Sequence, residues 1–136
     1  MNQNMMEKAN QIIKNAANAN LGVIDGDGYP VVMAMSLTNT ENIAEVYMTT
    51  TLDSNKAKCL QNNNKASVCF STNEHNITLV GVAEIITDQE IKRKCWQNWF
   101  VEVYPGGETD PTYCVIRFTA KRVSLFIDGE VAAFNL

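Results

Sequence analysis

The chain has 136 residues, of which 46% are hydrophobic and 19% are charged, as is typical of a soluble globular protein with its own hydrophobic core. Its net charge of −4 and its pI of about 4.9 argue against general binding to nucleic acid or to an anionic membrane, because no positive field attracts phosphate groups. The length predicts one domain.

The first residues are polar and lack the apolar core of a signal peptide, and no apolar run is long enough to cross a bilayer. We therefore expect a cytoplasmic protein. The cysteines form no CxxC pair and accompany a single histidine, His75, so no metal site is predicted. We expect buried free thiols at all four cysteines, namely Cys59, Cys69, Cys95 and Cys114.

Helical spacing of apolar residues predicts a first helix from about Met5 to Asn18. The sequence DGDG at 25–28 then separates two apolar runs. This pattern favours a β-hairpin over a calcium loop, because the further carboxylates and the terminal glutamate of an EF-hand are missing. The strand after the turn, Val31–Leu37, is almost continuously apolar. We expect both of its faces to be covered, one by the core and the other by a ligand or a second subunit.

A third strand, Ile43–Thr49, leads into threonines and then into a helix that begins at Asp53 or Ser54. Lys56 and Lys58 lie near the helix start, where acidic residues are normally favoured. Together with free amides and nearby hydroxyls, these lysines indicate an anion site for a phosphate-bearing ligand. The alternative is that Asp53 or Ser54 only caps the helix and that both lysines are solvated.

The remaining strands are predicted at 66–70, 77–86, 113–126 and 131–134, and Gly81 inside the second of them indicates a bulge or bend. Short turns between neighbouring strands imply an antiparallel sheet. Strands outnumber helices, so a small closed or split barrel is the natural way to remove exposed sheet edges.

The pattern of a capping box at 87–90 predicts a third helix that reaches about Val103. Its apolar stripe consists of Ile91, Cys95, Trp99 and Phe100. We expect the charges at 92–94 to lie on a solvated face, and His75, in a polar turn, to be exposed.

Several segments, in this order, resemble the pyridoxamine 5′-phosphate oxidase-like family of FMN-binding split barrels, most closely its small general stress protein branch. They are Asp27–Pro30, Thr50–Lys56, Asn62–Phe70, Val80–Glu84 and Tyr104–Tyr113. The resemblance covers Leu21 to about Phe126. It implies a mainly β fold with flanking helices, a six- to seven-stranded antiparallel split β-barrel that fills a single domain, 1–136. It also implies a homodimer that holds FMN in grooves between its subunits.

The resemblance further implies cofactor-binding residues. Those around the FMN phosphate are Thr49, Thr50, Ser54, Asn55 and Lys56. Those along the isoalloxazine ring, partly through backbone groups, are Met33, Ala34 and Met35. Asn76 matches a position that contacts the cofactor in the oxidases.

The chain departs from the oxidases in two ways. They commonly carry arginines, which are planar bidentate phosphate donors, at the positions of Met33 and Asn55, so Lys56 remains the main cation. The C-terminal arginine and tryptophan that the oxidases use for the pyridoxal substrate have no clear match near 126–129. Oxidation of pyridoxamine phosphate itself is therefore not expected.

The favoured function is that of an FMN-dependent oxidoreductase acting on an unknown small molecule. No catalytic residue is assigned, since neither His75 nor Tyr47 has further support. One alternative is a non-catalytic barrel that binds or senses flavin or another phosphate ligand. Another is a barrel that has lost its ligand and survives as a structural dimer. Trp96 and Trp99 are expected to anchor the core or the dimer rather than stack on flavin.

Overall fold

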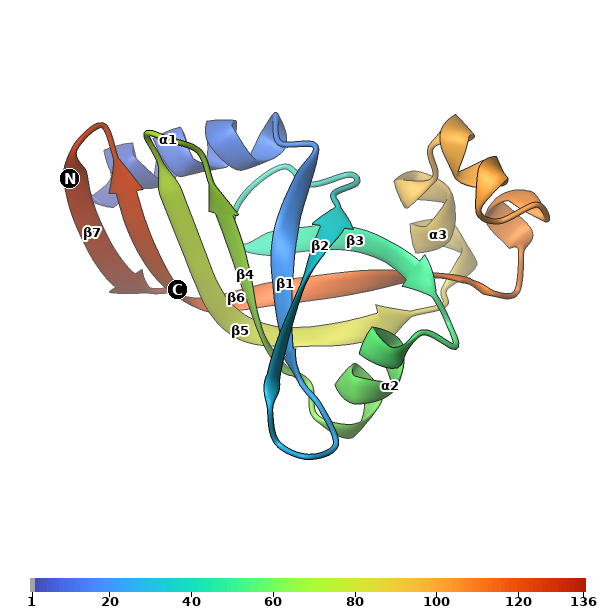
Figure 1. Cartoon of the computed structure of the whole chain (residues 1–136). Coiled ribbons are helices and arrows are strands. Elements are labelled where there is room, and N and C mark those ends of the chain that lie inside the picture. Colours follow the sequence, from blue (N-terminus) through green and yellow to red (C-terminus); the bar gives the residue numbers. More distant parts are fainter. Residues whose placement is uncertain (1) are drawn as a thin grey trace.

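The computed structural model of the protein describes residues 2–136, in which seven strands form one antiparallel sheet flanked by three α-helices (Figure 1). The helices are α1 (Asn2–Lys14), α2 (Asn55–Asn62) and α3 (Gln89–Cys95), with 3₁₀ helices η1 (Asn98–Glu102) and η2 (Gly107–Thr109). The strands are β1 (Asn18–Ile24), β2 (Pro30–Ser36), β3 (Glu45–Thr51), β4 (Lys65–Ser71), β5 (Asn76–Ile86), β6 (Tyr113–Ile127) and β7 (Glu130–Asn135).

The strand order is β2-β1-β4-β5-β6-β3, with β7 paired to β6 beside this path. The two end strands, β2 and β3, share no ladder. They meet at one isolated bridge, between Leu37 and Met48, beside which the amide of Thr38 donates to the carbonyl of Tyr47 at 2.9 Å. The predicted mainly β fold, an antiparallel split barrel with flanking helices, is confirmed.

Alternating burial along the strands builds the main core. In β1 the side chains of Ala19, Leu21 and Val23 point inward, while their neighbours face outward. The inner face of α1, with Met5, Ala9 and Ile13, packs into the same core. Figure 1 shows α1 at the end of the sheet near β7, with α2 and α3 toward the opposite end.

A second, smaller core lies between α3, η1 and the start of β6. It is built from aromatic rings in edge and tilted contacts, with ring centroids 5.0 Å apart for Tyr104 and Tyr113 and 5.5 Å apart for Trp96 and Phe100. Such contacts add to the stabilisation from burial alone. They hold η1 against the barrel, which matters because η1 forms one wall of the cleft described below.

Gly81 lies at a register shift between β5 and β6, so the predicted bulge is confirmed. A Cβ atom at this position would lie 2.0 Å from the carbonyl oxygen of Thr119. Glycine is therefore needed here for the close approach of two backbones.

Two helix boundaries differ from the prediction. The first helix ends at Lys14 and not at Asn18, because Asn18 already pairs with Ser36 in the sheet. The third helix ends at Cys95, and Trp96 is extended (φ −66°, ψ 138°) before η1 begins. Apolar residues continue at helical spacing beyond the C-terminal end of each helix, so the sequence pattern did not predict where the helices end.

The expected cover of one face of β2 by a ligand or a second subunit stays a prediction, and the single chain leaves much of this strand exposed. Met35 is buried, but Val31, Val32 and Ala34 are exposed, and Val32 has 68% of its surface accessible. The predicted hairpin before β2 is confirmed. Its turn is closed by the Asp25 carboxylate, which accepts hydrogen bonds from the amides of Asp27 and Tyr29.

All four cysteines are free thiols. Cys95 and Cys114 are buried as predicted, and burial raises the pKa of each thiol to about 11. Cys59 and Cys69 are only half-buried, so the prediction of full burial is wrong for these two. No helix within residues 2–136 combines the length and the apolar character needed to span a bilayer.

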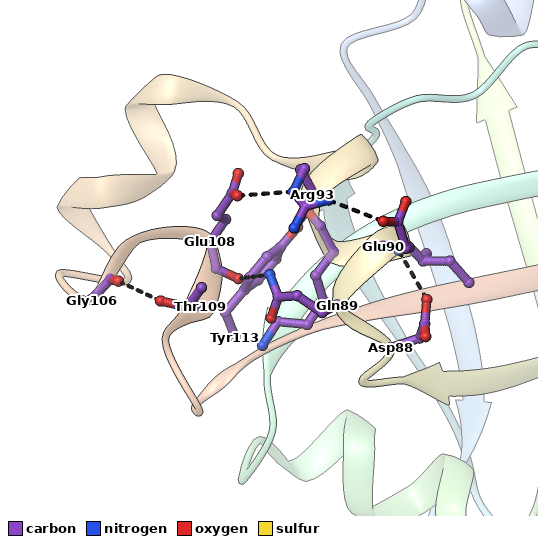
Figure 2. A network of polar contacts seen from close by, with 10 residues as sticks. Asp88, Gln89, Glu90, Arg93, Gly106, Glu108, Thr109 and Tyr113 are labelled. Carbon is purple, nitrogen blue, oxygen red and sulfur yellow. Dashed lines mark hydrogen bonds and ion pairs between the residues drawn. The ribbon is translucent and has the colours of Figure 1, made fainter.

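Lys92 is buried, with 5% of its surface exposed, so the predicted solvated face does not include it. Its Nζ donates to the carbonyl of Asp110 at 3.1 Å and lies 5.2 Å from the centroid of the Tyr113 ring. Figure 2 shows the exposed Arg93 nearby, bonded to both Glu90 and Glu108. These contacts tie α3 to the loop that leads into β6.

Replacing Asp110 with asparagine is expected to lower the free energy of unfolding near neutral pH and to lose this effect in acid. The carboxylate accepts hydrogen bonds from the Thr112 amide (2.9 Å) and hydroxyl (2.8 Å) and from the Gly106 amide (3.0 Å). These bonds hold the pKa of Asp110 below its ordinary value of 3.8. A carboxyl with a lowered pKa stabilises the fold above the unfolded pKa, and this contribution is lost as pH falls through the folded pKa.

Urea denaturation of the wild type and Asp110→Asn, at neutral pH and at steps below pH 3.8, measures this difference, which should narrow in acid. Asp27→Asn, on an exposed turn, is the matched control. If the difference in the free energy of unfolding between the wild type and Asp110→Asn stays constant across this pH range, the charge of the carboxylate does not contribute to stability.

Candidate functional site

A cleft of about 230 Å³ opens where β3 ends and α2 begins; we call it the α2 cleft. It is lined by Ala34–Ser36 of β2, Thr49–Thr51 of β3, Lys56 of α2 and, from the η1 side, Trp99, Phe100, Val103 and Tyr104. Five of the nine predicted cofactor residues therefore meet at one place: Ala34, Met35, Thr49, Thr50 and Lys56.

The start of α2 is capped by Ser54. Its hydroxyl accepts a hydrogen bond from the amide of Ala57 at 3.2 Å and another from the hydroxyl of Thr50 at 3.0 Å. Ser54 therefore acts as the cap, as the alternative interpretation held. The cap leaves the amides of Asn55 and Lys56 without a hydrogen-bond partner within residues 2–136. Two free amides at a helix start are suited to binding an anion.

The two lysines of α2 differ. Lys56 is half-buried and lines the α2 cleft, and no ion pair within the described chain involves it. Lys58 is exposed and is not part of the lining. The alternative interpretation, in which both lysines are solvated, therefore holds for Lys58 only. Lys56 supplies the positive charge of the cleft. No acidic residue occurs in the first turn of α2.

The remaining predicted residues lie outside the lining. Asn55 is exposed at the start of α2, and Met33 packs half-buried against the main core. Asn76 begins β5, where it pairs with Ser71 and Phe126, and its side-chain oxygen accepts a hydrogen bond from the hydroxyl of Thr78 at 2.8 Å. Within one chain, Asn76 does not reach the α2 cleft.

Tyr104 is a cleft residue that sequence reasoning missed. Burial is the main cause of the raised pKa of its phenol, and hydrogen bonding toward Thr51 and Thr49 opposes the rise. Tyr104 and these threonines line the same cleft. Strand alternation was the available signal for Thr51, because it shares a face with Thr49. Nothing local marked Tyr104, which reaches the cleft only through the packing of η1.

Neither residue considered as a catalyst lies in the α2 cleft. Tyr47 donates its hydroxyl to Glu45, and burial is the main cause of its raised pKa. His75 is half-buried, so the prediction of an exposed histidine is wrong, and its Nδ1 is buried without a hydrogen-bond partner among the described residues. Among the described residues, no group of three or more His, Cys, Asp or Glu side chains is placed to hold a metal ion.

The sequence profile of the family described as pyridoxamine 5′-phosphate oxidase like matches residues 4–127. The chain belongs to this family. The predicted family is thereby confirmed, and the match extends from α1 to the end of β6. No curated protein sequence matches this member of the family.

Solved structures share the fold of this family member. A Clostridium acetobutylicum protein related to general stress protein 26 of Bacillus subtilis has a TM-score of 0.87 at 22% identity, covering 100% of this chain and 97% of that one. General stress protein 26 of Bacillus anthracis has a TM-score of 0.82 at 22% identity, covering 96% and 98%. A heme binding protein of Mycobacterium smegmatis has a TM-score of 0.74 at 15% identity, covering 96% and 57%. At these identities the likeness establishes the fold alone.

Proposed function

We propose that this chain binds FMN in the α2 cleft and acts as an oxidoreductase on a small molecule, as a single cytoplasmic domain that spans 1–136. The observation that carries the proposal is that Lys56 lies beside the threonines of β3 and next to two helix amides that have no hydrogen-bond partner in the part of the chain that the structure describes. A phosphate monoester is the group that such donors fit, because positive charge and free N–H groups converge there.

In this proposal, different residues bind different parts of the cofactor. Lys56 and the amides of Asn55 and Lys56 hold the phosphate, while Thr49 adds a hydroxyl donor. Thr50 and Ser54 act mainly by fixing each other and the helix start. The β2 segment 33–35 runs along the ring. Bound flavin supplies hydride or electron transfer, and the chain orients it and excludes water.

A homodimer completes the proposed site. Asn76 lies away from the α2 cleft of its own chain, so it can contact FMN only from a second copy. Apolar side chains on the outer face of the sheet support such pairing. Val32, Phe126 and Val131 are exposed there, Val131 with 79% of its surface accessible.

A non-catalytic binding protein is the second candidate. Lys56 and Tyr104 are the titratable side chains that line the α2 cleft, which contains no carboxylate or imidazole within the described chain. Any proton transfer would therefore have to use the flavin, the substrate or water. One structural neighbour is named as a heme binding protein, so haem belongs in the ligand panel.

FMN is expected to raise the melting temperature of the purified protein more than riboflavin does. Riboflavin has the same ring and lacks the phosphate, so the comparison isolates the contacts of Lys56 and the helix amides. A ligand that binds only the folded state stabilises it by RT ln(1 + [L]/Kd), about 2.7 kcal/mol at a hundredfold excess over Kd.

Thermal shift with FMN, riboflavin, haem and pyridoxal 5′-phosphate, together with the absorbance spectrum of the protein as purified, makes this comparison. Equal shifts for FMN and riboflavin would mean that the phosphate adds nothing to binding, and would contradict the proposed phosphate site. No shift with any ligand would favour a barrel without a cofactor. Flavin binding without NAD(P)H-dependent turnover of any acceptor would favour the non-catalytic candidate.

A further inference from the structure

A second cleft, of about 490 Å³, adjoins the α2 cleft; we call it the Trp99 cleft. Ser36 and Trp99 line both, so the two clefts lie next to each other at these residues. The phosphate-binding role proposed above uses only the α2 cleft. It assigns nothing to the larger Trp99 cleft.

Trp99 is half exposed, with 51% of its surface accessible, but its ring is fixed. Its Nε1 donates to Oε1 of Gln97 at 2.9 Å, and Nε2 of Gln97 donates to the Thr38 hydroxyl at 3.2 Å. That hydroxyl donates in turn to the carbonyl of Cys95 at 2.6 Å. The ring also meets Phe100 edge-on, with centroids 4.7 Å apart.

A fixed aromatic face offers stacking area without the entropic cost of ordering a mobile side chain. The hydrogen bonds from Trp99 through Gln97 and Thr38 to Cys95 therefore hold the indole ring in place while about half of its surface stays accessible.

The polar groups of the Trp99 cleft are mainly amides and hydroxyls, among them Asn39 and Gln97. Its charged residues are Lys14 and Glu41, whose side chains pair with each other at 3.2 Å on the exposed rim. Among the described residues, the Trp99 cleft therefore carries no unpaired charge for an anion, in contrast to the α2 cleft with Lys56. Amides and hydroxyls match a ligand that is uncharged and forms hydrogen bonds.

We propose that the Trp99 cleft binds an uncharged planar ring bearing an amide or carbonyl group, stacked on Trp99 and oriented by Gln97 and neighbouring amides. As the substrate position of an oxidoreductase, it rests on the proposed function, because Ser36 and Trp99 line both this cleft and the proposed flavin site. As a binding site, it stands on its own. The same chemistry disfavours a phosphorylated or carboxylated ring at this position.

Nicotinamide and nicotinate are matched probes, with the same ring carrying an amide or a carboxylate. At about 0.15 M salt, where the Debye length is about 8 Å, the net negative charge of the protein is largely screened at long range. Calorimetric titration is expected to show nicotinamide binding at least about tenfold tighter than nicotinate. This corresponds to about 1.4 kcal/mol.

Gln97→Leu removes both side-chain hydrogen bonds of Gln97 and is expected to weaken nicotinamide binding about tenfold. Asn98→Leu makes a similar change one residue away, outside both clefts, and should bind like the wild type. Equal affinity for the two probes, tighter binding of nicotinate, no binding of either, or no effect of Gln97→Leu would each overturn the proposal. If Gln97→Leu does not fold, the ratio between the probes in the wild type decides alone.

The titration is run on protein whose FMN binding has been measured separately. If the protein fails to bind FMN but binds nicotinamide in a way that depends on Gln97, the proposed function is contradicted and the proposed ligand site is supported. FMN binding with no preference between the two probes would end the ligand site and leave the proposed function standing.

Discussion

Replacing Lys56 with alanine is expected to weaken FMN binding by about one to two orders of magnitude, with little effect on folding. A hydrogen bond to a charged group contributes about 1.5–3 kcal/mol, and about 1.4 kcal/mol is a tenfold change in affinity. Lys56 lines the α2 cleft without an ion pair in the described chain, so little else depends on its charge. Flavin fluorescence titration measures the affinity, and urea denaturation checks the fold.

Lys58→Ala is the matched control, because it removes the same charge from the exposed side of the same helix. Its FMN affinity should stay within about twofold of the wild type, since surface charges screened by salt contribute little. If Lys56→Ala is silent, and Thr50→Ala and Ser54→Ala are silent too, the phosphate is held elsewhere. If Lys56→Ala and Lys58→Ala weaken binding equally, the effect is one of overall charge.

The largest loss of stability is expected from Gly81→Ala. The added Cβ would lie 2.0 Å from the Thr119 carbonyl oxygen and 3.0 Å from Cα of Ala120, both of them backbone atoms. Overpacking usually costs about 1–3 kcal/mol and more where the neighbour cannot move. We therefore expect a loss of about 3 kcal/mol or more in the free energy of unfolding, measured by urea denaturation.

Gly22→Ala is the matched control, because it is also a strand glycine and its nearest neighbour, the Ser67 carbonyl oxygen, would lie 3.7 Å from the new Cβ. Its stability should remain within about 1 kcal/mol of the wild type, since ordinary van der Waals contact allows the methyl group. Equal losses for the two variants would mean that the close approach of β5 and β6 relaxes readily.

The strands were predictable because their signals are local. Alternating burial and the hairpin turn at 25–28 both follow from residues that are neighbours in the sequence. The same holds for the start of α2, where Ser54 caps the helix as its residue type suggests. The end of the third helix was not predictable, because Trp96 and Trp99 continue the apolar spacing beyond Cys95.

The residues of the candidate site likewise fall into those that the sequence predicted and those that it did not. Lys56, Thr49 and Thr50 adjoin one strand-to-helix junction, so sequence proximity brought them together. Tyr104 and Trp99 enter from a segment about fifty residues later, through the aromatic packing of η1. Lys92 illustrates the same limit, since its burial depends on Asp110 in the loop before β6 and on Tyr113 at the start of β6.

The α2 cleft lies where the two end strands of the sheet meet, and this position decides how its walls are held together. Its walls are β2 and β3, the two strands that touch at one bridge, between Leu37 and Met48. Few backbone hydrogen bonds therefore join the two walls directly, and their contact depends mainly on the buried side chains of Leu37 and Met48. A molecule bound between the walls would add the connection that the sheet itself lacks there.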